Sequence, residues 1–181
     1  MVERLRDEYT VEVEWKPFYL RPDTPPEGME LPEYIQRARK NGSEERLVAM
    51  AGVYGMSFRS TERIYNTRLA HEATAYAREH GRGNEFHKVI FRKVYADGFD
   101  PSQWDVLRAT AEEAGLNAEE IQQAVESGTY TAAVAEAVQW AYRIGVQGVP
   151  TYVINDRYAL VGAQPHEVFK QALGRILNQK G

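Results

Sequence analysis

The sequence predicts an α/β fold in which a long helical block interrupts a small sheet-forming core. Three observations support this class. Apolar and polar residues alternate over residues 11–16, which is the period of a strand with one wet face. Helical periodicity follows over residues 31–145, and two short apolar runs and an amphipathic segment close the chain. The predicted order is therefore helix end, strand, helical block, two strands and helix.

Composition places the chain among ordinary globular domains. It has 181 residues, of which 43% are hydrophobic and 27% are charged, and the charges are scattered along it. A net charge of −4 does not suggest a nucleic-acid partner. No apolar run is long enough to span a membrane, and the charged opening octet does not resemble a secretory signal, so we expect a cytoplasmic protein without a membrane partner.

The first 28 residues predict three short pieces. Residues 1–8 have high helix propensity but few apolar side chains that could pack on a core. We therefore interpret them as the end of a helix. Residues 11–19 predict a strand, which Pro17 confines to a sheet edge or brings to its end. Residues 21–28 hold three prolines and predict a stiff loop.

The block that follows predicts helices only. Asp100 and Pro101 suit the start of one helix, Gly115 suits its stop, and Asn117 with Glu120 has the spacing of a capping box. The expected helices cover residues 32–40, 43–56, 66–80, 84–96, 102–114, 118–127 and 131–144.

The C-terminal part predicts a hairpin and a helix. Residues 151–154 and 158–161 are two buried strands joined by the polar turn 155–157. Pro165 suits the first turn of the last helix. A double apolar stripe packs that helix on a sheet, and it consists of Val168, Phe169, Ala172, Leu173, Ile176 and Leu177.

Residues that could carry chemistry do not form a recognisable set. His71 and Glu72 begin like a zinc-binding helix motif, but Ala75 stands where the second histidine belongs, so we interpret His71 as a partly buried helix residue and predict no metal site. Adjacent glutamates point to different parts of a helix surface, and no glycine pattern fits a phosphate. The chain has no cysteine, which excludes a thiol nucleophile. No cofactor is predicted.

Several stretches together resemble a known family. They are Val11–Phe18, Leu20–Gly28, Asn66–His71, Gly145–Ile154, Arg157–Pro165 and Glu167–Phe169. They resemble the DsbA-like thioredoxin domain, specifically its FrnE-like branch, over nearly all of residues 1–178. The resemblance implies a single domain over residues 1–181, with a thioredoxin-like core from residues 1–20 and 146–181 and a helical insert at residues 31–145.

The resemblance also implies a binding site. Val149 and Pro150 correspond to the family's cis-proline loop, which offers backbone groups to an extended substrate chain. We therefore expect Gly148, Val149, Pro150 and Thr151 to bind a polypeptide or a small thiol.

The chain departs from the family in one respect. Similar proteins carry Cys-x-x-Cys at the start of the first helix, whereas residues 1–8 resemble only the end of that helix. We expect the chain to be inactive in thiol exchange, with no catalytic residue. Three hypotheses remain open: a thiol–disulfide oxidoreductase that lacks its N-terminal part, a non-catalytic binding module, and a relative of glutathione-dependent isomerases or kappa-type transferases.

The first strand of the thioredoxin arrangement would lie between the strands 11–19 and 151–154. Its loss leaves a gap in the expected sheet. The two strands pair directly, or the edge stays open, or another chain donates a strand, for example in a homodimer. Unpaired backbone groups would make the isolated chain prone to aggregation.

Overall fold

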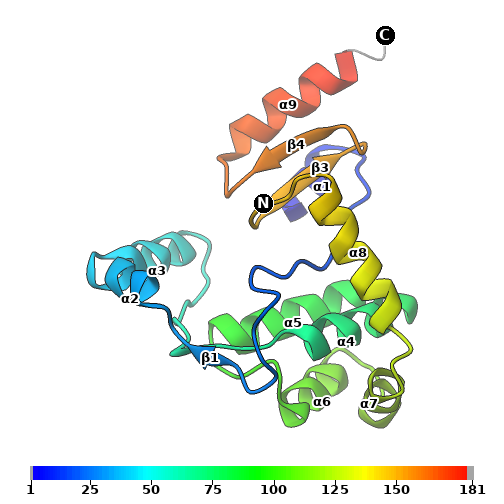
Figure 1. Cartoon of the computed structure of the whole chain (residues 1–181). Coiled ribbons are helices and arrows are strands. Elements are labelled where there is room, and N and C mark those ends of the chain that lie inside the picture. Colours follow the sequence, from blue (N-terminus) through cyan, green and yellow to red (C-terminus); the bar gives the residue numbers. More distant parts are fainter. Residues whose placement is uncertain (1, 179–181) are drawn as a thin grey trace. The chain divides into compact units, whose positions relative to one another are not determined.

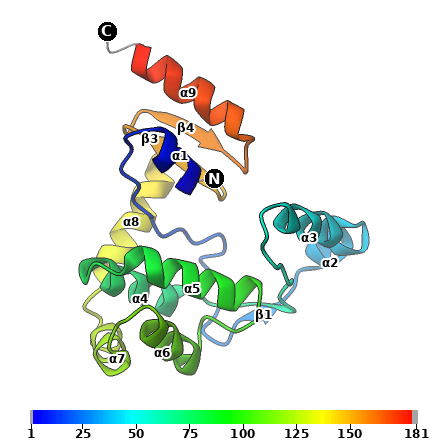
Figure 2. The ribbon, with the colours of Figure 1, turned by 180° about the vertical axis from the view of Figure 1, so that it is seen from behind.

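The computed structural model describes residues 2–178 (Figures 1 and 2). The chain divides into two compact units, which are described separately. Unit one consists of residues 1–20 and 137–181, of which 2–20 and 137–178 are described. Unit two consists of residues 21–136. Among the described residues, no helix has the length and apolar character needed to cross a membrane.

Unit one is built on a two-stranded hairpin. Strands β3 (Thr151–Ile154) and β4 (Tyr158–Val161) pair antiparallel, with Tyr152 opposite Leu160. Helix α9 (His166–Asn178) runs along the hairpin in both ribbon views (Figures 1 and 2). The unit also holds α1 (Val2–Glu8) and the C-terminal half of α8 (Thr131–Arg143).

The core of unit one lies on one face of this hairpin. Leu5, Phe169 and Leu173 are buried together, and they pack against a partly buried layer from the two strands and the residue that follows α1. That layer consists of Tyr9, Tyr152, Ile154 and Leu160. The aromatic rings of Phe169 and Tyr152 meet edge to face with their centroids 4.7 Å apart. The predicted stripe on the last helix is therefore confirmed, except that Leu177 is exposed.

The turn between β3 and β4 matches its polar sequence. Asn155 and Asp156 both have positive φ, at 51° and 52°. Asparagine and aspartate adopt this left-handed conformation more readily than other residues with a side chain, and two in succession are typical of a tight hairpin turn. The predicted hairpin is confirmed with the same strand boundaries.

The strand predicted over residues 11–19 is wrong. This segment is described throughout, but it joins no ladder. Val11 and Val13 are half-buried and Glu12 and Glu14 are exposed, so the alternation that predicted a strand persists in the side chains. A strand also requires a hydrogen-bonded partner, and no described strand lies against this segment. Of the three arrangements considered for this edge, direct pairing of the segment with residues 151–154 does not occur.

Side chains hold this segment to α8 instead. The hydroxyl of Tyr142 donates a hydrogen bond of 2.8 Å to the carbonyl of Tyr19. The ring of Phe18 meets the Tyr142 ring at 5.2 Å with an edge-to-face geometry. Lys16 places its ammonium 5.8 Å from the centre of the Trp140 ring. These contacts all lie within unit one.

Unit two is mostly helical, as predicted. The core of the unit contains Phe86, Leu107, Ala111 and Ile121, each fully buried. The helices are α2 (Glu33–Lys40), α3 (Ser43–Val53), α4 (Arg68–Glu79), α5 (Gly83–Tyr95), α6 (Trp104–Glu113), α7 (Ala118–Glu126) and the N-terminal half of α8.

Helix ends in unit two follow the predicted signals with one correction. Asn117 accepts hydrogen bonds from the backbone N–H groups of Glu119 and Glu120, at 2.9 and 3.2 Å, so the predicted cap of α7 is confirmed. Asp100 does not cap a helix that starts at residue 102. Its side chain accepts from the N–H of Ser102 in a local turn, and α6 begins only at Trp104.

The insert is not entirely helical, which is a second correction. Strands β1 (Met29–Glu30) and β2 (Arg63–Ile64) form a two-residue antiparallel ladder. Gly28 precedes β1 with φ of 74°, and a Cβ atom there would lie 2.6 Å from the Ile64 carbonyl oxygen. Only glycine allows this approach of the two backbones. A ladder of two residues is too short to produce a recognisable alternation of apolar and polar residues in the sequence.

Candidate functional site

The predicted loop Gly148–Thr151 leads from α8 into β3 in unit one. The Thr151 hydroxyl donates a hydrogen bond of 2.7 Å to the carbonyl of Gly148 and closes the loop. The Val149–Pro150 peptide bond is cis. The Pro150 carbonyl accepts from the N–H of Gly162 at 2.8 Å, which ties the loop to the end of β4. The Val149 side chain is 53% exposed.

The hydrogen-bond pattern shows which backbone groups of β3 are available. Opposed pairs in an antiparallel ladder alternate between bonded and non-bonded pairs. Because Pro150 and Gly162 form a bonded position, the groups of Tyr152 face β4. The N–H and C=O groups of Thr151 and Val153 therefore point to the other edge. No strand in the described part of the chain pairs with that edge.

A hollow of about 310 Å³ lies beside this loop in unit one. Its walls include the hairpin face opposite α9, with Val153 and Ala159, and the end of α8, with Trp140 and Ile144. Arg157 brings a cation to it from the turn. The sequence did not indicate this hollow, because both strands read as buried runs. In the structure all four residues from Thr151 to Ile154 are only half-buried, so neither face of β3 is fully covered.

The histidines do not converge on a site. His71 is half-buried on α4, as interpreted from the sequence. His166 Nε2 lies 3.1 Å from Glu8 Oε2, a contact between α9 and α1. Burial lowers the pKa of His87 to about 4, so this side chain is neutral at pH 7. Within residues 2–178, no three histidine, aspartate or glutamate side chains lie close enough to hold a metal ion.

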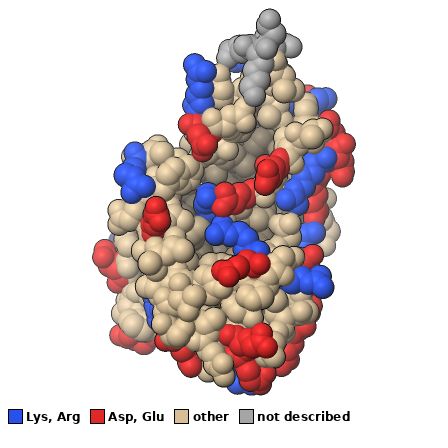
Figure 3. Space-filling view, turned by 90° about the vertical axis from the view of Figure 1, so that its right-hand side faces the viewer, with Lys and Arg blue, Asp and Glu red and all other residues tan. Residues whose placement is uncertain are grey.

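Charge does not mark a binding surface on the face drawn in Figure 3. Lysine and arginine are interspersed there with aspartate and glutamate. Charged side chains of the described chain also form ion pairs with one another, such as the two-pronged contact of Arg92 with Glu113 at 2.7 Å. In this pair, hydrogen bonding to Arg92 lowers the pKa of Glu113. Such exposed pairs belong to an ordinary solvated surface.

The chemistry open to the loop is recognition through backbone hydrogen bonds. An exposed strand edge accepts an extended chain, which pairs with its free N–H and C=O groups. The hollow beside it offers apolar wall area for side chains. Dithiol exchange requires a thiolate nucleophile, and the chain contains no cysteine.

Comparison with known proteins gives a consistent result. The profile of the DSBA-like thioredoxin domain matches residues 1–174. YwbO of Bacillus subtilis, a protein without an assigned activity, is 29% identical over 164 residues, which are 90% of this chain and 81% of YwbO. The crystal structure of a probable DsbA oxidoreductase from Streptomyces coelicolor superimposes with a TM-score of 0.80 and 28% identity, covering 90% of this chain and 74% of that one.

A second kind of relative is an isomerase. The 2-hydroxychromene-2-carboxylate isomerase of Sphingobium xenophagum is 29% identical over 85 residues, which are 47% of this chain and 44% of the isomerase. The similarities thus extend to a probable oxidoreductase and to an isomerase.

Proposed function

The chain belongs to the DSBA-like thioredoxin domain family, and from this premise we propose that it binds extended polypeptide segments along the loop Gly148–Thr151 and the outer edge of β3. The observation that carries the proposal is the outward-facing backbone of Thr151 and Val153, which continues from the exposed Val149. A peptide added there extends the hairpin by one strand.

Within this family, we assign the 181-residue protein to the FrnE-like branch of thiol–disulfide oxidoreductases. Support comes from the proline-rich stretch Leu20–Gly28 and from Arg157–Pro165. The 181-residue chain has no cysteine, so it binds without thiol exchange. In an insulin-reduction assay with dithiothreitol, we expect the rate with this chain to equal the rate in buffer.

The binding test uses a fluorescent insulin B chain whose cysteines are alkylated, so that only non-covalent binding is measured by anisotropy. Val153→Pro removes the outward N–H of β3 and leaves the bonds to β4 intact. Loss of this bond and the bulk of the ring weaken binding roughly tenfold.

Val161→Pro is the matched control. Val161 lies opposite Thr151, so its N–H also points outward, but at the far edge of β4, and its side chain is 63% exposed. We expect the affinity to change by less than about twofold, because this substitution removes no contact to the peptide. Equal losses for the two variants would contradict the assignment to β3.

A second candidate function is a glutathione-dependent isomerase activity. It is favoured by the sequence similarity to the isomerase of Sphingobium xenophagum. The two candidates differ in their ligand. Binding of reduced glutathione is measured by isothermal titration calorimetry. Saturable binding, together with displacement of the labelled B chain by glutathione, supports the isomerase candidate. Saturation by the B chain alone supports peptide binding.

A further inference from the structure

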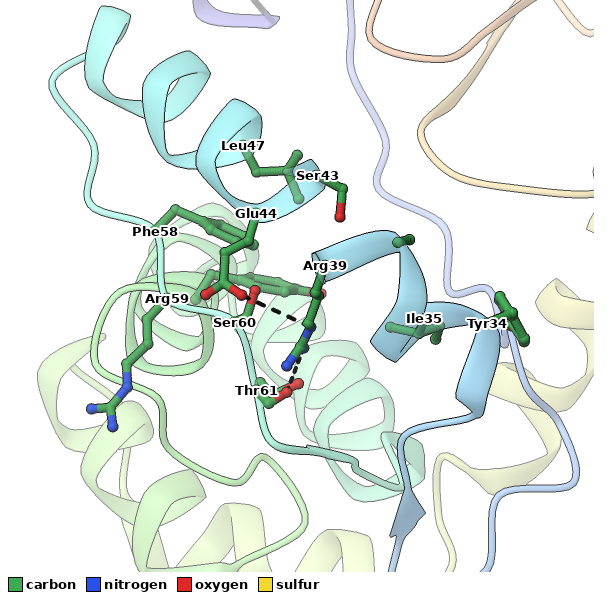
Figure 4. Close-up of a pocket in the computed structure, with 12 residues that line it drawn as sticks. Tyr34, Ile35, Arg39, Ser43, Glu44, Leu47, Phe58, Arg59, Ser60 and Thr61 are labelled. Atoms are coloured by element: carbon green, nitrogen blue, oxygen red, sulfur yellow. Dashed lines mark hydrogen bonds and ion pairs between the residues drawn. The ribbon is translucent and has the colours of Figure 1, made fainter. Parts of the chain in front are cut away.

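A pocket of about 240 Å³ lies within unit two, away from the loop of the proposed function in the sequence (Figure 4). It is formed by α2, the start of α3, the segment Phe58–Thr61 and Tyr95 at the end of α5. The N–H of Arg59 donates a hydrogen bond of 2.6 Å to the Tyr95 carbonyl, which fixes this segment to α5. The pocket therefore has walls from separate elements that are tied together.

The walls of this pocket are largely apolar and aromatic. The rings of Phe58 and Tyr95 are nearly parallel, at an interplanar angle of 12° and a centroid distance of 6.2 Å. Tyr34, Ile35 and Leu47 contribute further apolar surface. Apolar and aromatic walls favour a ligand with an apolar ring, because ring contacts and apolar burial both stabilise it. The volume limits that ligand to a small molecule.

One cation, Arg39, extends into the pocket from α2 (Figure 4). Its side chain is 25% exposed, and its Nη2 donates a hydrogen bond of 2.6 Å to the Thr61 carbonyl. The nearest carboxylate oxygen, Oε2 of Glu44, lies 4.0 Å from Nε, which exceeds hydrogen-bond distance. A guanidinium has five N–H donors, so most of them remain available to a ligand.

The other charges around the pocket do not provide a second cationic contact. The side chain of Arg59 points away from Arg39 in Figure 4, and its Cδ lies near Gly98. Glu44 adds a negative charge on the same rim. A phosphate, with its higher charge, would meet one guanidinium and one repelling carboxylate. A carboxylate carries a single charge and matches the guanidinium fork.

From these contacts we propose that the pocket binds a small aromatic carboxylate. Its ring lies between the apolar walls and its carboxylate is held by Arg39. Ser43, Ser60 and Thr61 supply hydroxyl groups on the polar side. The bound carboxylate takes the place of Glu44 as the anionic neighbour of Arg39, and Glu44 turns to solvent. This site is independent of the proposed peptide function.

The test measures binding of naphthalene-2-carboxylate to the full chain by isothermal titration calorimetry. Naphthalene-2-carboxamide, which has the same ring without the charge, serves as the ligand control. We expect Arg39→Gln to weaken binding of the acid roughly tenfold, because a charged hydrogen-bonded contact is lost. Glu44→Gln strengthens it about threefold, because the competing carboxylate is removed.

Arg37→Gln is the matched protein control. Arg37 lies on the same helix, is 70% exposed and pairs with Glu33, so its loss leaves the affinity unchanged within about twofold. Since Arg39 also supports the Thr61 carbonyl, Leu47→Trp provides a second variant that fills the rim and blocks the ring. Saturable binding that both variants weaken, Arg39→Gln roughly tenfold, supports the site. Equal affinity for acid and amide, no binding, or binding unchanged in both variants would overturn it.

Discussion

Truncation of Phe169 tests the packing beneath β3, the strand that follows the loop Gly148–Thr151. Phe169 is 1% exposed and lies beneath β3, with its ring against Tyr152 at 4.7 Å and with Leu5 and Leu173 as buried neighbours. Replacing a fully buried phenylalanine by alanine costs about 3–5 kcal/mol. A domain is stable by only about 5–15 kcal/mol, so Phe169→Ala removes a large part of the stability of unit one.

Thermal unfolding measures this effect. For a chain of this length, 1 kcal/mol corresponds to about 2–4 °C, so we expect the midpoint of unit one to fall by about 6–20 °C. Two of the three tryptophans, Trp15 and Trp140, lie in unit one and Trp104 lies in unit two, so tryptophan fluorescence is weighted toward unit one, and circular dichroism follows all helices. Phe91→Ala is the control, because Phe91 is 50% exposed on α5. Equal midpoint shifts in the two variants would refute the packing described for α9.

Three further predictions concern the loop, a helix cap and a half-buried histidine. Thr151→Val removes the hydroxyl that donates to the Gly148 carbonyl, which loosens the loop. We expect this variant to bind the alkylated B chain about fivefold more weakly, whereas Thr151→Ser retains the wild-type affinity. Equal affinities of the two variants would argue against a role of the hydroxyl in shaping the loop. Asn117→Ala removes two hydrogen bonds to backbone N–H groups at the start of α7. We expect the free energy of unfolding to fall by about 1 kcal/mol and the midpoint of thermal unfolding by about 2–4 °C. An unchanged midpoint would contradict the role of Asn117 as a cap. The pKa of His87 is about 4 in the folded chain and about 6.5 in the unfolded chain. Between these pH values the unfolded chain binds more protons than the folded chain. The free energy of unfolding therefore falls as the pH drops from 6.5 to 4. We expect His87→Phe to flatten this pH dependence of the free energy of unfolding, measured by denaturant titration. Parallel pH profiles for the wild type and the variant would count against the lowered pKa of His87.

Local signals predicted most of the fold. Asn117 fixes the start of α7 through its own side chain, and the polar turn at Asn155 and Asp156 sets the hairpin. Both depend on residues close in the sequence. The amphipathic stripe of α9 likewise predicted the burial of Phe169 and Leu173.

Features that depend on distant partners could not be predicted in the same way. Val11 and Val13 alternate with glutamates, but the pattern does not show whether a partner strand exists, and no described strand pairs there. The two-residue ladder of β1 with β2 depends on the close approach of Gly28 to Ile64, which are far apart in the sequence. The loop Gly148–Thr151 came from a family resemblance, whereas the hollow beside it required the three-dimensional arrangement of Trp140 and the hairpin.

Amide hydrogen exchange, resolved by residue, shows whether a bound peptide pairs with β3. The chain is measured alone and with saturating alkylated insulin B chain. If the peptide pairs with β3, the outward amides of Thr151 and Val153 become protected on binding, while exchange at the amide of Val161 on the far edge of β4 is unchanged. Protection at Val161 without protection at Thr151 and Val153, or saturation of the chain with no change at either edge, would contradict peptide binding along β3.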